Sequence, residues 1–252
     1  MTIDFDKSIV LLGDITEIAS AKDFLKEKGF RVISDPESSL DSSAHIVIEM
    51  NNLDLEKKKE DLQKAEKWYG ENTLILSTTL GISATEAASF LKHPSRLIGY
   101  GFFGSWEDIK LVELAPALQS KSTYIDQAAA FFQALGKETE VVQDEVGLVF
   151  PRVLSLIINE AAFALTEGIA TAEEIDLAMQ KGTNYPMGPL AWADKIGIDN
   201  VYAVLKGLYR NLGEERYRPA PLIRKMVHAG WLGERTGKGF YEKREQERWD
   251  MK

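Results

Sequence analysis

The sequence contains no cysteine and only three histidines among 252 residues. Without cysteine the chain cannot form disulfide bonds, use a thiolate nucleophile or hold zinc through sulfur, and no other residue set predicts a metal site. No apolar run approaches the roughly 18–20 residues that a membrane-spanning helix needs, and the first residues lack a signal-peptide pattern. The net charge of −9 at pH 7 argues against nucleic acid and anionic membranes as general partners. We therefore expect a cytoplasmic protein that binds neither.

The N-terminal part of the chain alternates between short apolar runs and a helical pattern. An apolar run at residues 8–13 ends in glycine, residues 18–29 place apolar side chains on one helical face, and residues 29–33 form a second apolar run. This order predicts a β-α-β unit, in which a helix connects two parallel strands. A fold built from such units binds its ligand at the carboxyl ends of the strands.

Two more strands are expected at residues 44–49 and 72–79. The helix predicted between them, at residues 53–70, carries a dense run of charges that we expect to face solvent. The last part of the chain has a helical pattern throughout. We therefore predict an α/β domain at residues 1–145, with a shortened Rossmann-like, doubly wound parallel sheet, and an all-helical domain at residues 146–252. The ligand cleft should lie between the two domains.

The turn after the first strand departs from the glycine pattern of dinucleotide-binding turns. In that pattern, G-x-G-x-x-G, glycines let the backbone approach a pyrophosphate at the N-terminus of a helix. Here Gly13 is kept as a candidate cofactor contact, while Ile15 and Ile18 stand at the two other glycine positions. Asp14 and Glu17 also add negative charge beside the expected pyrophosphate. The turn thus argues against tight binding of NAD in the usual pose.

Two acidic residues follow or end strands of the predicted sheet and are further candidate cofactor contacts. Asp35 comes after the second strand, about where a carboxylate would bind the ribose of a dinucleotide. Because Asp35 precedes a proline, it also fits the start of a simple turn, which we favour. Glu49 ends the third strand, at the sheet edge where ligands bind.

The helical part carries several spaced motifs in one order. They are Gly182-x-Asn184-Tyr185-Pro186-Met187-Gly188-Pro189, Arg218-Pro219-Ala220-Pro221 and Gly237-Lys238-Gly239-Phe240-Tyr241. With these motifs the chain resembles the 3-hydroxyacyl-CoA dehydrogenase family, strongly over residues 144–243 and continuously before them. The resemblance implies NAD as cofactor, an acyl-CoA or another small molecule as ligand, a homodimer formed through the C-terminal helices, and a place in fatty-acid and acyl-CoA metabolism.

The resemblance also locates the expected active site. The family pattern is Arg-x-x-Gly-x-His-Phe-x-Asn-Pro followed by Leu-Val-Glu, and this chain keeps its frame from Arg96 to Glu113. Gly101 stands at the position of the catalytic His, and Pro151 stands near that of a further family Asn. Glycine cannot transfer a proton. We therefore predict Glu113, the family's partner of that His, and Thr78, which matches its hydroxyl residues at a strand end, as the remaining catalytic candidates.

A histidine from elsewhere could replace the missing base. His93 lies in a loop that precedes this segment and is the candidate we keep, because loops often carry function. His45 is expected at a strand end and His228 at the surface of a helix. Glu113 itself could bind a different ligand or merely pair with Arg96.

Three functions remain open at this point. The combined loss of the glycines, the His, the Asn and the family's helical excursion before the third strand predicts a degenerate relative with weak or absent hydride transfer, which acts as a binding or partner subunit. The alternative is an active NAD-dependent 3-hydroxyacyl-CoA dehydrogenase with relocated residues such as Glu113. A third function is an enzyme for a smaller, non-CoA substrate with Glu113 as the base, which a Glu113 in an apolar cleft would favour.

Overall fold

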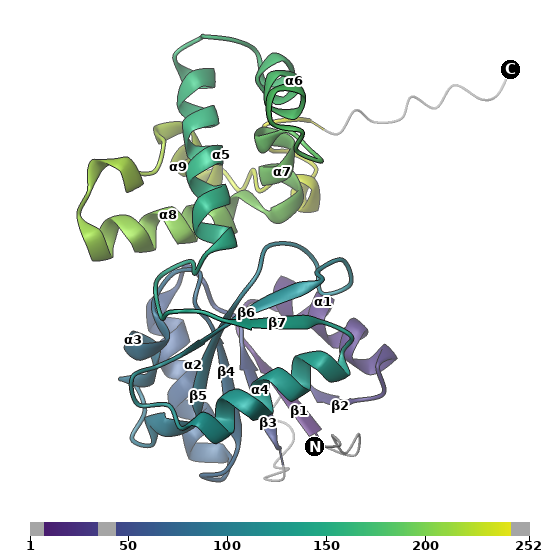
Figure 1. The fold of residues 1–252 in the computed structure, drawn as a ribbon, viewed down its shortest axis with the longest axis vertical. Coiled ribbons are helices and arrows are strands. Elements are labelled where there is room, and N and C mark those ends of the chain that lie inside the picture. The colour runs from purple at the N-terminus through teal and green to yellow at the C-terminus, as the bar shows by residue number, and fades with distance from the viewer. Residues whose placement is uncertain (1–7, 35–43, 243–252) are drawn as a thin grey trace, which may run out of the picture.

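The chain forms an α/β domain followed by a helical domain, stacked along the longest axis of the molecule (Figure 1). The structure is a computed structural model and describes residues 8–34 and 44–242. The predicted fold class is confirmed: a mainly parallel sheet with helices on both faces precedes an all-helical part. Among the described residues, no helix is both long and apolar enough to cross a bilayer.

Seven strands of the described chain form one sheet in the order β2-β1-β3-β4-β5-β6-β7. They are β1 (Ser8–Leu12), β2 (Arg31–Ile33), β3 (Ile46–Glu49), β4 (Leu74–Thr78), β5 (Leu97–Gly101), β6 (Leu111–Pro116) and β7 (Glu138–Val141). Neighbouring strands are parallel except β5 and β6, which are antiparallel. The strand order reverses between β1 and β3, and ligands of such sheets bind at this reversal, outside the carboxyl ends of the strands.

Helices cover both faces of the sheet because the strands bury their side chains on both sides. On one face lie α1 (Ile15–Glu27) and α4 (Ser122–Ala134), and on the other lie α2 (Leu55–Trp68) and α3 (Ala84–Ala88). Phe131 of α4 is fully buried, and each such side chain contributes about 1.5–3 kcal/mol to folding.

One expectation about α2 was wrong. Its charged run does not lie wholly in solvent, because Lys58 and Asp61 are only 1% and 2% exposed. They occupy the same helical face as the buried Leu62 and Ala65, with spacings of three, four and seven residues from Lys58. The two charged side chains are buried because polar groups at the end of β3 lie beneath them, as described below.

The helical domain packs its helices around a core of its own. It comprises α5 (Phe150–Thr166), α6 (Ala172–Thr183), α7 (Pro189–Ile196), α8 (Ile198–Leu212) and α9 (Pro221–His228), with short 3-10 turns at Glu215–Tyr217 and Glu234–Thr236. Two aspartates hold the segments that connect these helices, which we call the joint: the start of α7 and the segment at Phe240 and Tyr241. Asp176 accepts hydrogen bonds from the backbone N–H groups of Leu190 and Ala191 at 2.8 Å each, and Asp194 accepts those of Phe240 and Tyr241 at 2.9 and 2.8 Å.

The two domains touch closely where α8 crosses the loop after β4. A side chain on Gly207 of α8 would place its Cβ 2.4 Å from the carbonyl oxygen of Gly81, so only glycine allows this approach. Leu80 and Phe103 of the α/β domain join the core of the helical domain. The cleft between the domains is therefore narrow and bounded by side chains from both.

Candidate functional site

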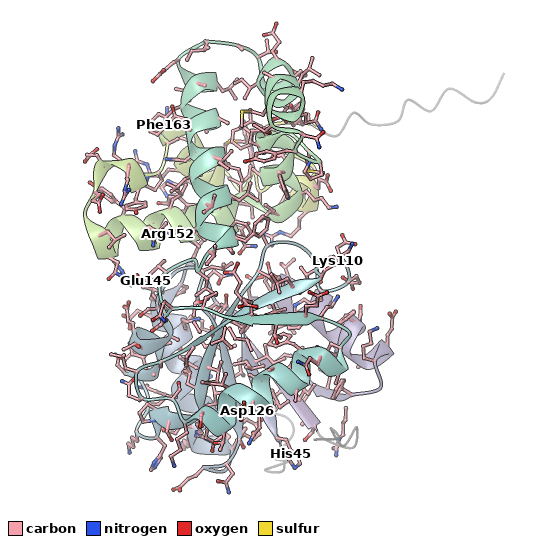
Figure 2. The ribbon with its side chains drawn as sticks, in the orientation of Figure 1. His45, Lys110, Asp126, Glu145, Arg152 and Phe163 are labelled. Atoms are coloured by element: carbon pink, nitrogen blue, oxygen red, sulfur yellow. The ribbon has the colours of Figure 1, made fainter. Side chains whose placement is uncertain are left out.

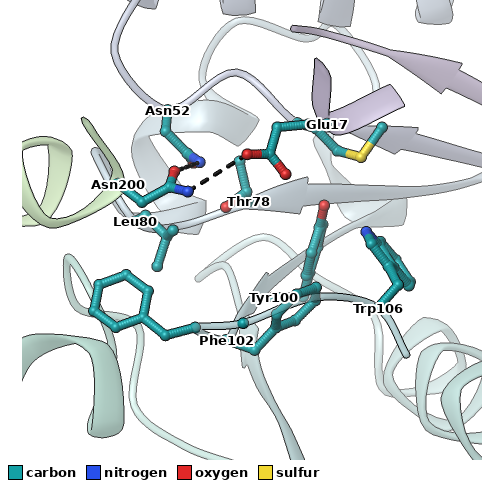
Figure 3. A pocket seen from close by; sticks show the side chains of 11 residues that line it. Glu17, Asn52, Thr78, Leu80, Tyr100, Phe102, Trp106 and Asn200 are labelled. Atoms are coloured by element: carbon teal, nitrogen blue, oxygen red, sulfur yellow. Dashed lines mark hydrogen bonds between the residues drawn. The ribbon is translucent and has the colours of Figure 1, made fainter. Parts of the chain in front are cut away.

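A small pocket lies at the carboxyl ends of the strands, beneath the start of α8 (Figure 3). Figure 3 shows two opposed walls: Glu17, Asn52 and Asn200 form one, and Tyr100, Phe102 and Trp106 form the other. The pocket has a volume of about 30 Å³. Since a water molecule needs about 10–15 Å³ of such volume, the pocket has room for about two or three waters. Side chains thus fill most of the cleft at the strand reversal.

The first turn of α1 differs from the expectation. The helix begins at Ile15, not at residue 18, because the Asp14 side chain caps it by accepting the N–H groups of Thr16 at 2.8 Å and Glu17 at 3.4 Å. Ile15 is 84% exposed and does not fill the cleft. Gly13 has a φ of 133°, a conformation that other residues rarely adopt. The N–H groups at the start of α1 are therefore already bound by a carboxylate of the chain itself.

Glu17 links α1 to the helical domain across the pocket. Its Oε1 accepts a hydrogen bond of 3.4 Å from the Asn200 amide, and Asn52 donates to Asn200 Oδ1 at 2.9 Å. Arg235 reaches Glu17 at 3.4 Å and Asp199 at 2.6 Å. Burial raises the pKa of Glu17, while the Asn200 hydrogen bond and the Arg235 charge oppose the rise. Neither Glu17 nor Asn200 was predicted as part of a polar contact between the domains.

Glu113 is engaged by the helical domain. It is 5% exposed, and its carboxylate accepts the backbone N–H groups of Val149 at 2.7 Å and Phe150 at 2.8 Å. The side chain therefore holds the start of α5. The alternative pairing with Arg96 is wrong, because Arg96 lies before β5, at the amino end of the sheet, and donates to the carbonyl oxygen of Gly70.

The position of the expected catalytic His lies against a neighbouring side chain. Gly101 pairs with Glu113 in the antiparallel ladder of β5 and β6. A Cβ on Gly101 would lie 2.9 Å from Cδ1 of Leu148, which is buried. Leu148 has a positive φ of 52°, which is uncommon for a residue other than glycine. Pro151 is buried in the first turn of α5, where its missing N–H leaves no hydrogen bond unmade.

Glu49 takes part in a fully buried network beneath α2. Its carboxylate accepts bonds from Ser77 Oγ at 2.7 Å, the Asn51 N–H at 2.6 Å and the ammonium group of Lys58. Lys58 also donates to the carbonyl oxygens of Asn51 and Thr78. Burial raises the pKa of Glu49 and lowers that of Lys58, while the contact between them acts in the opposite sense. Direct contact of the Glu49 carboxylate with a cofactor would require this network to open.

The structure brings Thr78 alone of the predicted site residues into the wall of the pocket. Asp35 lies outside the described residues. His93 precedes β5 at the amino end of the sheet, where its ring lies 3.7 Å from the Glu71 carboxylate, so it does not reach the pocket. His45 lies at the end of the sheet farthest from the helical domain (Figure 2), and His228 is exposed at the end of α9.

Comparison with protein-family models shows to which family the chain belongs. Residues 147–243 match the C-terminal domain of 3-hydroxyacyl-CoA dehydrogenase, and residues 21–145 match its NAD binding domain. The chain belongs to the 3-hydroxyacyl-CoA dehydrogenase family. The match to the NAD binding domain begins within α1, so it leaves out the altered turn that precedes this helix.

Individual relatives agree with the family. A probable 3-hydroxybutyryl-CoA dehydrogenase of Bacillus subtilis is 38% identical over 203 residues, which are 81% of this chain and 71% of that protein. The 3-hydroxybutyryl-CoA dehydrogenase of Clostridioides difficile is 35% identical over 243 residues, 94% of this chain and 86% of that one. The crystal structure of (S)-3-hydroxybutyryl-CoA dehydrogenase from Ralstonia eutropha matches with a TM-score of 0.75 and 31% identity, over 94% of this chain and 99% of that one.

Proposed function

We propose that this member of the 3-hydroxyacyl-CoA dehydrogenase family has weak or no hydride transfer and serves acyl-CoA metabolism as a binding or partner subunit. The observation that carries the proposal is the lack of a free proton acceptor at the position of the catalytic base. Gly101 offers no proton acceptor, and Leu148 lies within 2.9 Å of the place where any side chain would start. Glu113 is not free to take over, because both of its oxygens already accept backbone hydrogen bonds.

The residues around the α1 turn do not fit NAD in the usual pose. That pose places a pyrophosphate at the N-terminus of the helix after the first strand. In this chain the Asp14 carboxylate occupies those N–H groups, and a pyrophosphate beside it would meet like charge. Among residues 8–34 and 44–242, no Lys, Arg or His lines the adjacent pocket. We therefore propose that Gly13 and Glu49 are remnants of the NAD-binding domain rather than contacts of a bound cofactor.

The proposal includes a homodimer formed through the helical domain. Apolar side chains of α5 and of the segment before it support it, since Val149, Phe150 and Val153 are between 42% and 54% exposed. Exposed apolar groups that lie together favour an interface with another chain.

The proposal also keeps the division of the chain into two domains between residues 145 and 146. The end of β7 at Val141 and the start of α5 at Phe150 support this boundary.

A second function has support from the comparisons. The relatives are named dehydrogenases, and Thr78 still lines the pocket, so an active NAD-dependent 3-hydroxyacyl-CoA dehydrogenase with relocated groups is the alternative. A smaller-substrate enzyme with Glu113 as base has less support, because that carboxylate would have to release the N–H groups of Val149 and Phe150.

The deciding experiment measures NADH oxidation with acetoacetyl-CoA at high protein concentration, together with NADH binding by fluorescence. We expect neither turnover nor saturable binding. Turnover that is lost in Thr78→Val or Glu113→Gln would overturn the proposal in favour of the alternative. Circular dichroism of both variants is needed, because Glu113 also holds the start of α5.

A further inference from the structure

The pocket beneath Glu17 has the charge of a site for a cation. Glu17 is its one carboxylate, and no Lys, Arg or His lines it in the part of the chain that the structure describes. Tyr100 is the other ionisable side chain of the wall, and burial raises its pKa well above the ordinary value, so it stays neutral. Arg235 is the one cation that contacts Glu17 among the described residues, and it also pairs with Asp199, while Asp14 lies nearby. The charge around the pocket is therefore net negative, which favours a positive group over an anionic one.

The pairing of Glu17 is incomplete. Oε1 accepts two long contacts of 3.4 Å, from Asn200 and Arg235, and the shorter contact of Arg235, 2.6 Å, goes to Asp199. Within the described ranges no hydrogen bond reaches the second oxygen, Oε2, although the side chain is only 29% exposed. Asn52 Oδ1 is also buried without a hydrogen-bond partner in this part of the chain. The wall thus has more acceptors than donors.

The opposite wall is aromatic. The rings of Tyr100, Phe102 and Trp106 lie with their centroids between 5.3 and 6.3 Å apart, and the Phe102 and Trp106 rings meet at 84°. Figure 3 shows these side chains across the pocket from Glu17, with the Tyr100 hydroxyl pointing toward the Glu17 side. Aromatic faces attract cations within about 6 Å of their centroids, most strongly where water is excluded. A positive group in the pocket would therefore interact with a carboxylate on one side and with π-systems on the other.

The size of the pocket selects the kind of cation. A volume of about 30 Å³ admits groups of the size of water, as a primary ammonium group is. A trimethylammonium head is larger and offers no N–H to the unpaired acceptors. A metal ion finds no adequate ligand set, since the described residues contain no cluster of three or more His, Cys, Asp or Glu side chains that could hold one.

We propose that the pocket beneath Glu17 binds the ammonium group of a small primary amine, with Glu17 as its counter-ion and Phe102, Tyr100 and Trp106 as its aromatic wall. This inference deepens the binding role proposed above and rests on it, because the same cleft cannot hold an extended dinucleotide at that point. The N–H groups of the amine would donate to Glu17 Oε2, and the alkyl part would extend toward the cleft opening.

The test titrates methylammonium chloride into the whole protein by isothermal titration calorimetry or by chemical-shift changes of Trp106, against sodium chloride at equal ionic strength. We expect saturable binding in the millimolar range, as suits so small a ligand. Glu17→Gln should weaken it by about tenfold or more, the equivalent of 1.4 kcal/mol. The matched control Glu27→Gln, on the exposed side of the same helix, should leave it unchanged.

Three outcomes would overturn the proposal: no saturable binding, equal binding by Glu17→Gln, or equal binding of tetramethylammonium, which has no N–H group. A parallel titration with NADH separates this inference from the proposed function. NADH binding would overturn the proposal that NAD does not fit the α1 turn, and NADH turnover would overturn the proposed function. Absent methylammonium binding together with absent NADH binding would remove only the amine site.

Discussion

The joint between the helices of the helical domain and the cleft of the α/β domain both contain carboxylates that accept pairs of backbone N–H groups. In the two regions these carboxylates have different consequences for function. At the joint, Asp176 and Asp194 each accept two backbone N–H groups, and they hold the family's motifs in place. At the cleft, Asp14 and Glu113 likewise accept two backbone N–H groups each, where the family has its cofactor and its catalytic pair. A carboxylate at a ligand-binding edge is therefore not evidence of chemistry until its partners are known.

The largest expected effect lies in the α/β domain, at the buried pair of Glu49 and Lys58. Lys58→Met removes one partner and leaves the Glu49 carboxylate buried without its counter-ion, which costs about 3–5 kcal/mol. Glu49→Gln combined with Lys58→Met should recover much of this loss, because no unpaired charge remains. Urea denaturation measures both, and Lys59→Met on the exposed side of α2 is the control. An unchanged free energy of unfolding in Lys58→Met would mean that the pair is not formed.

A direct comparison of the joint and the cleft comes from Asp176→Ala and Glu113→Ala. Asp176 accepts three hydrogen bonds, including one of 2.9 Å from the Tyr241 hydroxyl, and we expect a loss of about 3–5 kcal/mol. Glu113 accepts two, from N–H groups at a helix start that water can reach, and we expect about 1–3 kcal/mol.

Thermal and urea unfolding of both variants test this order, with Glu173→Ala at an exposed position of α6 as the control. If Glu113→Ala were the more damaging change, the cleft rather than the joint would be the main structural connection, and our account of the joint would fail.

The contact between the Gly101 position and Leu148 predicts an effect of intermediate size. Gly101→His should cost about 1–3 kcal/mol, because its Cβ would lie 2.9 Å from Leu148. Leu148→Gly in the same chain should restore stability, since it removes the obstructing side chain and suits the φ of 52°. We expect no NADH oxidation from either variant, because the α1 turn is unchanged. Turnover in the double variant would show that the turn does bind NAD.

The fold could be predicted from the sequence, but the roles of several charged residues were predicted wrongly. Strand and helix patterns depend on local periodicity, which is visible along the chain, and the motifs of the helical domain lie within single segments. Lys58 was assigned to solvent from its charge, although its spacing with Leu62 and Ala65 would have placed it on the buried face. The contacts of Glu113 with Val149 and of Glu17 with Asn200 join distant segments, and no local pattern predicts such pairs.

The smallest expected effect concerns the pH dependence of Glu17. Its pKa in the folded state is raised above the ordinary 4.5, mainly by burial. Asp14 and Asp199 act in the same direction, whereas Arg235 and Asn200 oppose it. The folded protein thus binds this proton more readily than the unfolded chain, so the free energy of unfolding falls as pH rises from the ordinary value through the raised one. At pH values above that window, Glu17 is charged in both the folded and the unfolded state. The full free-energy cost of burying this charge then lowers the stability of the folded protein.

Glu17→Gln cannot ionise and should therefore be slightly more stable than the parent at pH 7. The difference should shrink as the pH falls below the ordinary value of a glutamate, because both proteins then carry a neutral side chain at this position. Melting temperatures measured from pH 4 to pH 8 test the prediction, with Glu27→Gln as the control. A Glu17→Gln protein that is less stable at pH 7 would contradict the prediction. It would mean that the contacts of the charged Glu17 with Arg235 and Asn200 stabilise the fold by more than the burial of its charge costs.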